Sequence, residues 1–321
     1  MSGDYIVAVD GGGSKTDAVA VTLDGIVLGR FRGPGSSPHL IGLASSVTLV
    51  DSIIGSLVRD RPPIHTGVYL SGLDLPREVD AYRDAIAGLS WGSGAVTVAN
   101  DLFALVRSGT ESPDAVAVVC GTGINAIGVR ADGATARFLA LGSISGDWGG
   151  ASGIGELALW HAARDEDGRG PATSLTAAVA RTLGYPSIAA ISEALHVGDL
   201  DLSRLGTLSP VVFEIARAGD AIAGSLVDRE AEEIAVMAAT CLRRLELLDR
   251  ELPVILGGGV IQGRDPRLLA GVGEHLAVLA PLATTLIVDS PPVLGAALLA
   301  LESAGASVDA VTRASDALAR S

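Results

Sequence analysis

The chain has 321 residues, which is enough for roughly two domains of ordinary size with buried cores. Apolar residues make up 48% of it and aromatic residues 3%, which indicates a compact globular protein. The net charge of −14 argues against nucleic acid or an anionic membrane as the main partner.

The first part of the chain is expected to form a three-strand meander followed by alternating helices and strands. Residues 5–31 contain three apolar runs separated by a glycine-rich turn and an Asp-Gly turn. After them, apolar residues at helical spacing predict helices over residues 45–59 and 79–89. Short apolar runs predict strands over residues 67–70 and 95–99.

The pattern of this meander occurs a second time over residues 115–141, with its own glycine loop and Asp-Gly turn. A duplicated unit of this kind predicts an α/β protein of two related lobes, each containing a mixed sheet. The remaining elements expected are helices over 155–163, 172–183, 186–195, 208–218, 221–248 and 293–301, strands over 253–256 and 285–288, and a frayed helix or tail over 304–321.

The glycine loop of the first meander has the composition of a phosphate-binding site. A P-loop or a Rossmann turn would need a helix after it, but residues 18–21 alternate as a strand does. A hairpin tip can still bind phosphates, because glycines let backbone amides approach closely. The alternative is a glycine-rich hairpin with an incidental carboxylate. The candidate phosphate ligands are Gly11, Gly12, Gly13, Ser14, Lys15 (the only lysine) and Thr16, and Asp10 is the candidate Mg²⁺ ligand.

The second meander and a later glycine run contain candidate nucleotide ligands that, unlike those of the first loop, carry no charge. Backbone amides and one hydroxyl are available in the second loop, and the glycines at 257–259 could expose backbone to a flat nucleoside. A helix-start turn is a nearly equal reading of those glycines. The candidate nucleotide ligands here are Gly121, Thr122, Gly123, Gly258 and Gly259.

Two acidic residues follow predicted strands or glycine-rich turns. Asp101, with Asn100 before it, comes directly after the strand at 95–99 and could accept a proton from an attacking hydroxyl. Asp147 lies in a glycine-dense loop and suits the binding of sugar hydroxyls. Each could instead cap the helix that follows it, and for Asp101 the two readings are about even.

Cysteine usage and the absence of targeting signals indicate a soluble, cytoplasmic protein. Cys120 and Cys241 are far apart and lack metal-site spacing, which favours two buried free thiols. A strand begins within the first few residues and leaves no room for a signal peptide. The longest apolar stretch, residues 276–288, is broken by Pro281 and is too short to span a bilayer.

These motifs resemble the BadF/BadG/BcrA/BcrD-type ATPases and, within them, the eukaryotic-type N-acetylglucosamine kinases. The similar stretches occur in the family's order along nearly the whole chain. They are residues 9–16, 100–101, 121–123, 146–147, 256–260 and 292–297.

The resemblance implies the actin, hexokinase and heat-shock chaperone fold, with a duplicated ribonuclease H-like topology. One lobe would comprise residues 1–112 plus 291–321, with a returning C-terminal helix, and the other residues 113–290. The implied activity is an ATP-dependent phosphorylation of N-acetylglucosamine, glucosamine or a related hexose by a cytoplasmic homodimer, with Mg-ATP held between the two glycine loops. Asp101 would be the general base, and the sugar would be bound by Ser37, Asn100, Asp101, Asn125 and Asp147.

The chain departs from that family pattern on the sugar side. Ser37 stands where these kinases have Asn, Leu141 where they have Trp, and Trp148 where they have Glu. The exact sugar therefore stays open, and a nucleotide-binding regulator without kinase activity is an alternative. A third reading is the redox-activating ATPase branch of the family. It is disfavoured because neither cysteine suits an iron–sulfur cluster.

Overall fold

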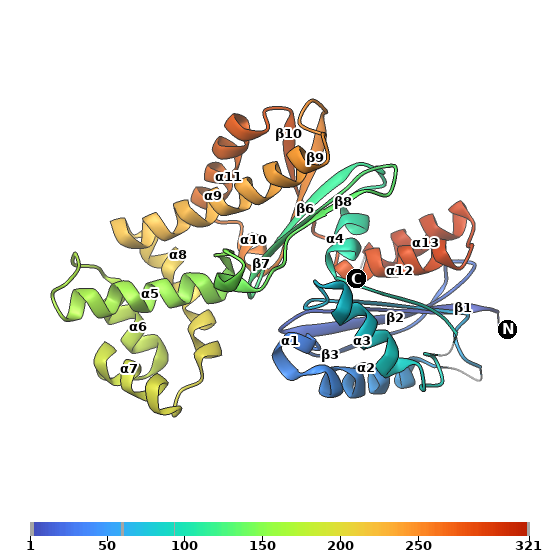
Figure 1. The fold of residues 1–321 in the computed structure, drawn as a ribbon, viewed down its shortest axis with the longest axis horizontal. Coiled ribbons are helices and arrows are strands. Elements are labelled where there is room, and N and C mark those ends of the chain that lie inside the picture. Colours follow the sequence, from blue (N-terminus) through green and yellow to red (C-terminus); the bar gives the residue numbers. More distant parts are fainter. Residues whose placement is uncertain (1–2, 59–60, 93, 320–321) are drawn as a thin grey trace. The chain divides into compact units, whose positions relative to one another are not determined.

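The computed structural model describes residues 3–58, 61–92 and 94–319, and its chain divides into two compact units (Figure 1). Unit 1 contains the residues up to Ala117, Val129–Ala140 and those from Leu286 onward. Unit 2 contains Val118–Gly128 and Leu141–Thr285. Two five-stranded sheets accompanied by helices confirm the expected α/β class.

The first sheet lies in unit 1 and has the strand order β3-β2-β1-β4-β5. Strand β1 pairs antiparallel with β2, and β1, β4 and β5 run parallel to one another. The strands are β1 (Tyr5–Gly11), β2 (Lys15–Thr22), β3 (Val27–Pro34), β4 (His65–Leu70) and β5 (Ala95–Ala99).

Strand β1 is buried along its whole length because helices cover both faces of this sheet. Successive side chains of a strand point to opposite faces, and β1 follows this rule. Tyr5, Val7 and Val9 belong to the core beneath α2 (Leu43–Leu57) and α3 (Pro76–Ile86). Ile6 and Ala8 belong to the core beneath α4 (Leu102–Gly109), α12 (Pro292–Ser303) and α13 (Val308–Ala319).

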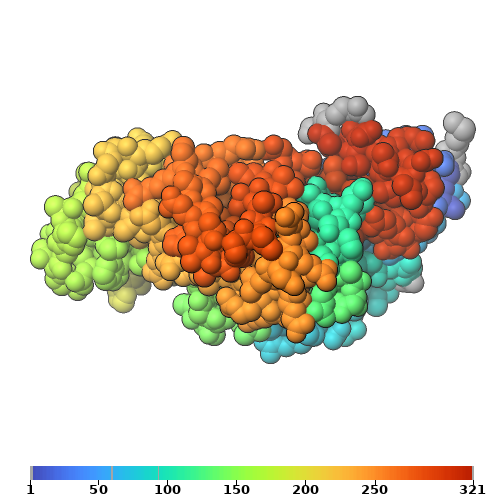
Figure 2. All heavy atoms as spheres, turned by 90° about the horizontal axis from the view of Figure 1, so that it is seen from above, coloured from blue at the N-terminus to red at the C-terminus, as the bar shows by residue number. Residues whose placement is uncertain are grey.

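The C-terminal residues complete unit 1. Helix α12 packs along α4, and Figure 2 shows the C-terminal helices in red beside it. The expected frayed helix or tail is an ordered helix, α13, whose Val311, Ala314 and Leu318 are buried. Residue 59, at the end of the helix expected over 45–59, and residues 320–321 of the tail lie outside the described residues.

The second sheet has the order β10-β9-β6-β7-β8, and helices make up most of unit 2. Among the described residues, no helix is long and apolar enough to cross a membrane. The strands are β6 (Ala115–Cys120), β7 (Ile124–Val129), β8 (Thr135–Arg137), β9 (Leu252–Gly257) and β10 (Ala283–Ile287). The helices are α5 (Gly150–Glu166), α6 (Leu175–Leu183), α7 (Ile188–Val197), α8 (Ser209–Arg217), α9 (Ala221–Arg244), α10 (Gly259–Gln262) and α11 (Pro266–Leu279).

Two elements of unit 2 differ from the sequence-based expectation. Helix α5 begins at Gly150 rather than near residue 155, because contacts with the second glycine loop outweigh the low helix propensity of glycine. Helix α11 was not expected. Pro266 at its first position and the Asp265 side chain, which accepts hydrogen bonds from the amides of Arg267 and Leu268, are a standard helix start.

Candidate active site

The carboxyl ends of three parallel strands bring Asp10 and the Asn100-Asp101 pair to one edge of the first sheet. Asp10 lies near the end of β1, and Asn100 follows β5 directly. Backbone hydrogen bonds tie the three strand ends together: the Ser71 amide donates to Gly11 O at 2.8 Å, and the Asp101 amide donates to Leu70 O at 3.3 Å. Chemistry at this edge can therefore use side chains from all three strands.

The first glycine loop is a tight hairpin tip between β1 and β2. The Gly12 amide donates to Lys15 O at 2.9 Å and closes the turn. Lys15 is half exposed, with its Nζ 3.5 Å from Asp17. Thr16 is buried, and its hydroxyl lies 2.7 Å from both Pro34 O and Ser36 Oγ. Thr16 therefore braces the loop, whereas Lys15 is accessible to a ligand.

Asp10 sits in an environment that favours a cation. Burial raises the pKa of Asp10 well above its usual value, and the carboxylates of Asp101 and Asp17 raise it further against a smaller opposing effect of Lys15. The Ser71 hydroxyl at the same edge is buried without a hydrogen-bond partner in the part of the chain that the structure describes. Crowded carboxylate oxygens and a spare hydroxyl are the donors that hydrated Mg²⁺ takes, so the residues fit this ion.

Asn100, rather than Asp101, caps helix α4. Asn100 Oδ1 accepts a hydrogen bond from the Leu102 amide at 3.0 Å, and its Nδ2 donates to Asp74 Oδ1 at 3.0 Å. Asp101 occupies the N-cap position but its side chain makes no capping hydrogen bond. The division of labour leaves the Asp101 carboxyl available for chemistry.

The pKa of Asp101 is raised to about 7. Burial is the main cause, and the Asp74 carboxylate adds to it. The backbone amides of Asp101 and Leu102 and the Arg137 guanidinium oppose the rise. A carboxyl that titrates near neutral pH is suited to accept a proton from a hydroxyl.

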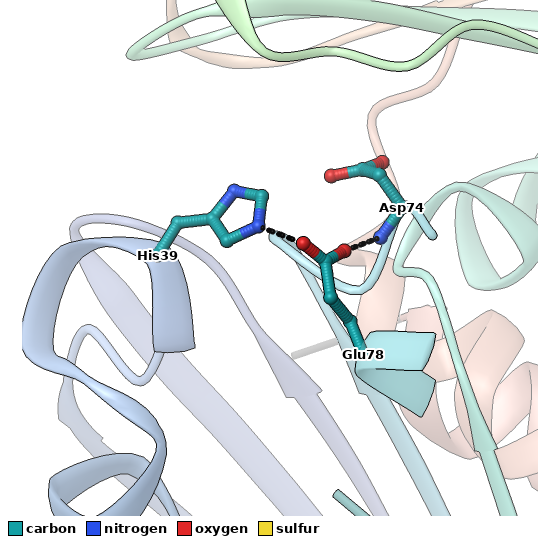
Figure 3. Close-up of side chains that lie close together, drawn as sticks. All are labelled: His39, Asp74 and Glu78. Atoms are coloured by element: carbon teal, nitrogen blue, oxygen red, sulfur yellow. Dashed lines mark hydrogen bonds and ion pairs between the residues drawn. The ribbon is translucent and has the colours of Figure 1, made fainter. Parts of the chain in front are cut away.

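Four polar residues at this edge were missed from the sequence: His39, Asp74, Glu78 and Arg137. His39 Nε2 lies 2.9 Å from Glu78 Oε1, and Glu78 Oε2 accepts a hydrogen bond from the Asp74 amide at 2.9 Å. Figure 3 draws both contacts as dashed lines. Arg137 comes from β8, and its Nη2 lies 3.8 Å from Asp74 Oδ1 and donates to Leu73 O at 3.1 Å. The Glu placed three residues after Leu75 was a readable helix-start signal. Arg137 had no comparable signal.

In the cluster of His39, Asp74 and Glu78, the Glu78 carboxylate stabilises the turn before α3 through hydrogen bonds. Burial alone would raise the pKa of Glu78, but hydrogen bonds from the Leu75 amide and from His39 outweigh it and the pKa is lowered. Glu78 therefore holds the start of α3 as a carboxylate. Ser37, the expected sugar ligand, is buried in the neighbouring segment, next to Gly72.

In unit 2, the second glycine loop is held by the first turn of α5. The amides of Ala151 and Ser152 donate to Gly121 O and Thr122 O at 2.8 and 2.9 Å. Thr122 and Gly123 are exposed at the tip of this loop. Asn125 follows in β7, where its Oδ1 accepts the Ala126 amide at 2.7 Å.

Gly258 and Gly259 lie beside this loop. A side chain at Gly258 would place a Cβ 2.3 Å from Cys120 O, and its φ is +95°, so only glycine fits. Gly259 is exposed and begins α10, as the helix-start reading of these glycines expected.

Asp147 lies before α5 but not at its N-cap, which is Gly149. The Ser145 hydroxyl donates to Asp147 Oδ2. Trp148 next to it stacks against Arg229, whose guanidinium carbon lies 4.1 Å from the ring centroid. The Asp147 carboxylate is thus half-buried in a loop rather than used as a helix cap.

Curated relatives match this chain over most of its length. An N-acetyl-D-glucosamine kinase of Dictyostelium discoideum is 28% identical, over 94% of this chain and 99% of the relative. An N-acetylmuramic acid/N-acetylglucosamine kinase of Clostridium acetobutylicum is 25% identical, over 80% and 85% of the two chains.

Solved structures show the same fold. A Chromobacterium violaceum protein described provisionally as an N-acetylglucosamine kinase matches with a TM-score of 0.73, 23% identity, and coverage of 93% of this chain and 99% of its own. A ROK family glucokinase of Streptomyces griseus, solved with glucose and AMPPNP, matches with a TM-score of 0.55, 17% identity, and coverage of 93% and 99%. The model of the BadF/BadG/BcrA/BcrD ATPase family matches residues 7–300. The chain therefore belongs to the BadF/BadG/BcrA/BcrD ATPase family.

Proposed function

We propose that this protein is an ATP-dependent sugar kinase that phosphorylates a hydroxyl of N-acetylglucosamine or a related amino sugar. The observation that carries the proposal is the position of Asp101, which lies at the same strand edge as Asp10 and the first glycine loop and whose pKa is raised by burial to about 7. Two relatives that match most of this chain are named as N-acetylglucosamine kinases, which favours this sugar class.

In the proposed reaction, the Asp101 carboxylate accepts the proton of the sugar hydroxyl while that oxygen attacks the γ-phosphorus of ATP. The bond from the γ-phosphorus to the β–γ bridging oxygen breaks, and ADP leaves. Lys15 offsets negative charge on the phosphates, and Asn100 holds the segment that carries Asp101. Asp10 would hold Mg²⁺, which supplies charge neutralisation on the phosphate oxygens.

The remaining predicted site residues take binding roles in this proposal. The Gly11–Gly13 and Gly121–Gly123 loops, with Ser14 and the Thr122 hydroxyl, serve the phosphates, and Gly258 and Gly259 serve the nucleoside. Thr16, also predicted as a phosphate ligand, is buried with its hydroxyl bonded to Pro34 O and Ser36 Oγ, so it holds the loop in place instead. Ser37, Asn125 and Asp147 serve the sugar. Cysteine usage underlies the proposal of a cytoplasmic location, and the family resemblance underlies the proposal of a homodimer. Light scattering of the purified protein would test the homodimer.

The decisive experiment measures ADP release with a panel of sugars, comparing the wild type with Asp101→Asn. The panel contains N-acetylglucosamine, glucosamine, N-acetylmuramic acid and glucose. Removing the base is expected to lower kcat by a factor on the order of 10²–10⁴. Asp84→Asn, an exposed substitution on α3, is the matched control and should retain activity. Undiminished turnover of Asp101→Asn would remove Asp101 from the mechanism, and ATP binding without turnover on any sugar would favour the regulator instead.

A further inference from the structure

Glu230, in the middle of helix α9, is a fully buried carboxylic acid beneath the second glycine loop. Its exposed fraction is 0%. Its neighbours on the same helix, Val227, Ala231 and Ile234, are apolar and equally buried. An isolated charge in such a place is costly, so its hydrogen-bond partners decide what it does.

Both partners of Glu230 flank the loop. Glu230 Oε1 accepts a hydrogen bond from the Cys120 thiol at 2.7 Å and from the Gly150 amide at 3.0 Å. Cys120 is the residue immediately before Gly121, and Gly150 is the first residue of α5. One oxygen therefore connects the strand that enters the loop with the helix whose first turn holds it.

The fit around these partners is tight. A Cβ at Gly150 would lie 2.5 Å from Gly123 C, so the backbone of α5 rests directly on the loop. The other oxygen, Glu230 Oε2, is buried without a hydrogen-bond partner in residues 3–58, 61–92 and 94–319. Burying a carboxyl oxygen without a hydrogen-bond partner costs free energy, which makes the two contacts of the other oxygen at the loop the feature to explain.

Burial, hydrogen bonds and charged neighbours all act on the ionisation of Glu230. Burial raises the pKa of Glu230, while the hydrogen bonds from Cys120 and Gly150 lower it. Glu233 and Arg229 on the same helix act in opposite directions. In either protonation state, Oε1 can accept both hydrogen bonds.

We propose that Glu230 is a positioning residue that holds the Gly121–Gly123 loop in the conformation that binds nucleotide phosphates. The inference rests on the proposed role of that loop in ATP binding. Without the carboxyl oxygen, the Gly150 amide and the Cys120 thiol lose their acceptor in a site closed to water, and the first turn of α5 shifts. The loop amides then no longer converge on the phosphates.

The test compares Glu230→Ala and Glu230→Gln with Glu232→Gln, an exposed acid on the same helix. Calorimetry measures the Kd for Mg-ADP, and kinetics measure KM for ATP and for the sugar. Glu230→Ala should raise the ADP Kd and the KM for ATP about tenfold or more, as expected when two buried hydrogen bonds are lost. The KM for the sugar should rise by a smaller factor than the KM for ATP, because Glu230 contacts Cys120 and Gly150 and none of the proposed sugar ligands.

Glu230→Gln distinguishes the loss of the hydrogen-bond acceptor from the loss of side-chain volume. Glu230→Gln keeps an oxygen acceptor of the same shape, so it should restore ADP affinity to within about threefold of the wild type. A folded Glu230→Ala with wild-type ADP affinity, or a folded Glu230→Gln as weak as Glu230→Ala, overturns the proposal. If Glu230→Ala does not fold, Glu230→Asp draws the carboxyl back by one methylene and should weaken ADP binding similarly; unchanged affinity there overturns it as well.

Failure of the proposed function has a different signature. Wild-type protein that binds Mg-ADP but phosphorylates no sugar would reject the kinase proposal while leaving the ADP comparison of the variants intact. Wild-type protein that does not bind Mg-ADP would reject the nucleotide role of the loop, and with it the role of Glu230.

Discussion

At the scale of single residues, Asp101 makes the activity depend on pH. Because its pKa is about 7, the fraction of carboxylate, and with it kcat/KM, should rise as the pH increases from 5.5 to 7 and level off above about 8. Half of the maximal value is expected near pH 7. A pH profile of kcat/KM at saturating ATP measures this, and a flat profile over that range would contradict Asp101 as the base.

Arg137 should shift that profile in a known direction. Its guanidinium lowers the pKa of Asp101, so Arg137→Gln should raise the pKa and move the rising limb to higher pH. Activity at pH 6.5 should then fall more than activity at pH 8.5. Arg83→Gln, on the exposed side of α3, is the control. An unmoved limb in a folded Arg137→Gln would contradict an electrostatic effect of Arg137 on Asp101.

The same carboxyl should cost stability at neutral pH. The pKa of Asp101 is about 7 in the fold and 3.8 in the unfolded chain. Between these pH values only the unfolded chain ionises, so the free energy of unfolding falls as the pH rises. The destabilising effect of Asp101 is absent below pH 3.8, grows progressively as the pH rises, and reaches its full size above about pH 7. Asp101→Asn should therefore raise the free energy of unfolding at pH 8, on the order of 2 kcal/mol, and leave it nearly unchanged near pH 4.

Urea titrations of the two proteins at both pH values measure this difference. An Asn variant that gains as much at pH 4 as at pH 8 would mean that packing, and not ionisation, causes the change. The expected combination of higher stability and lost activity is typical of a functional carboxyl held in an unfavourable environment.

At the scale of elements, the start of α5 shows where local patterns stop predicting structure. The sequence placed the Asp10 and Asn100-Asp101 positions correctly at strand ends, because apolar runs followed by polar residues are local signals. It did not predict the first turn of α5, because glycine has a low helix propensity and this turn is helical only through its packing against the glycine loop. Glu230 and Arg137 were missed for a related reason, since their partners lie far away in the sequence.

A pair of glycine substitutions tests this account of α5. Gly150 has φ of +70° and no room for a Cβ beside Gly123, so Gly150→Ala should lower the free energy of unfolding by about 1–3 kcal/mol and weaken ADP binding. Gly153, one turn later in the same helix, would place its Cβ 3.5 Å from Trp148, an ordinary contact. Gly153→Ala should therefore be neutral or slightly stabilising. Equal effects of the two variants in denaturant unfolding would contradict the close approach of α5 to the loop.

At the scale of the whole molecule, the first and the last described residues of the chain belong to the same compact unit. The family's motif order and the duplicated meanders were visible in the sequence, and they were enough to predict the fold class. The family resemblance also implied that residues 291–321 return to the first lobe, but the sequence left residues 304–321 open as a frayed helix or a tail, because their small side chains give a weak helical pattern. Helix α13 nevertheless covers the face of the first sheet that contains Ile6 and Ala8.

That face includes the strand that carries Asp10, so loosening α13 should destabilise unit 1. Leu318 is 1% exposed, and Leu318→Ala should lower the free energy of unfolding by about 2–4 kcal/mol. Val308, at the start of the same helix, is 80% exposed, and Val308→Ala should change it by less than about 0.5 kcal/mol. Urea unfolding of both variants measures the difference. Because Leu318 contacts no proposed ligand, kcat at low temperature should stay near the wild-type value in the folded fraction, whereas a Leu318→Ala protein as stable as Val308→Ala would mean that α13 is not part of the core.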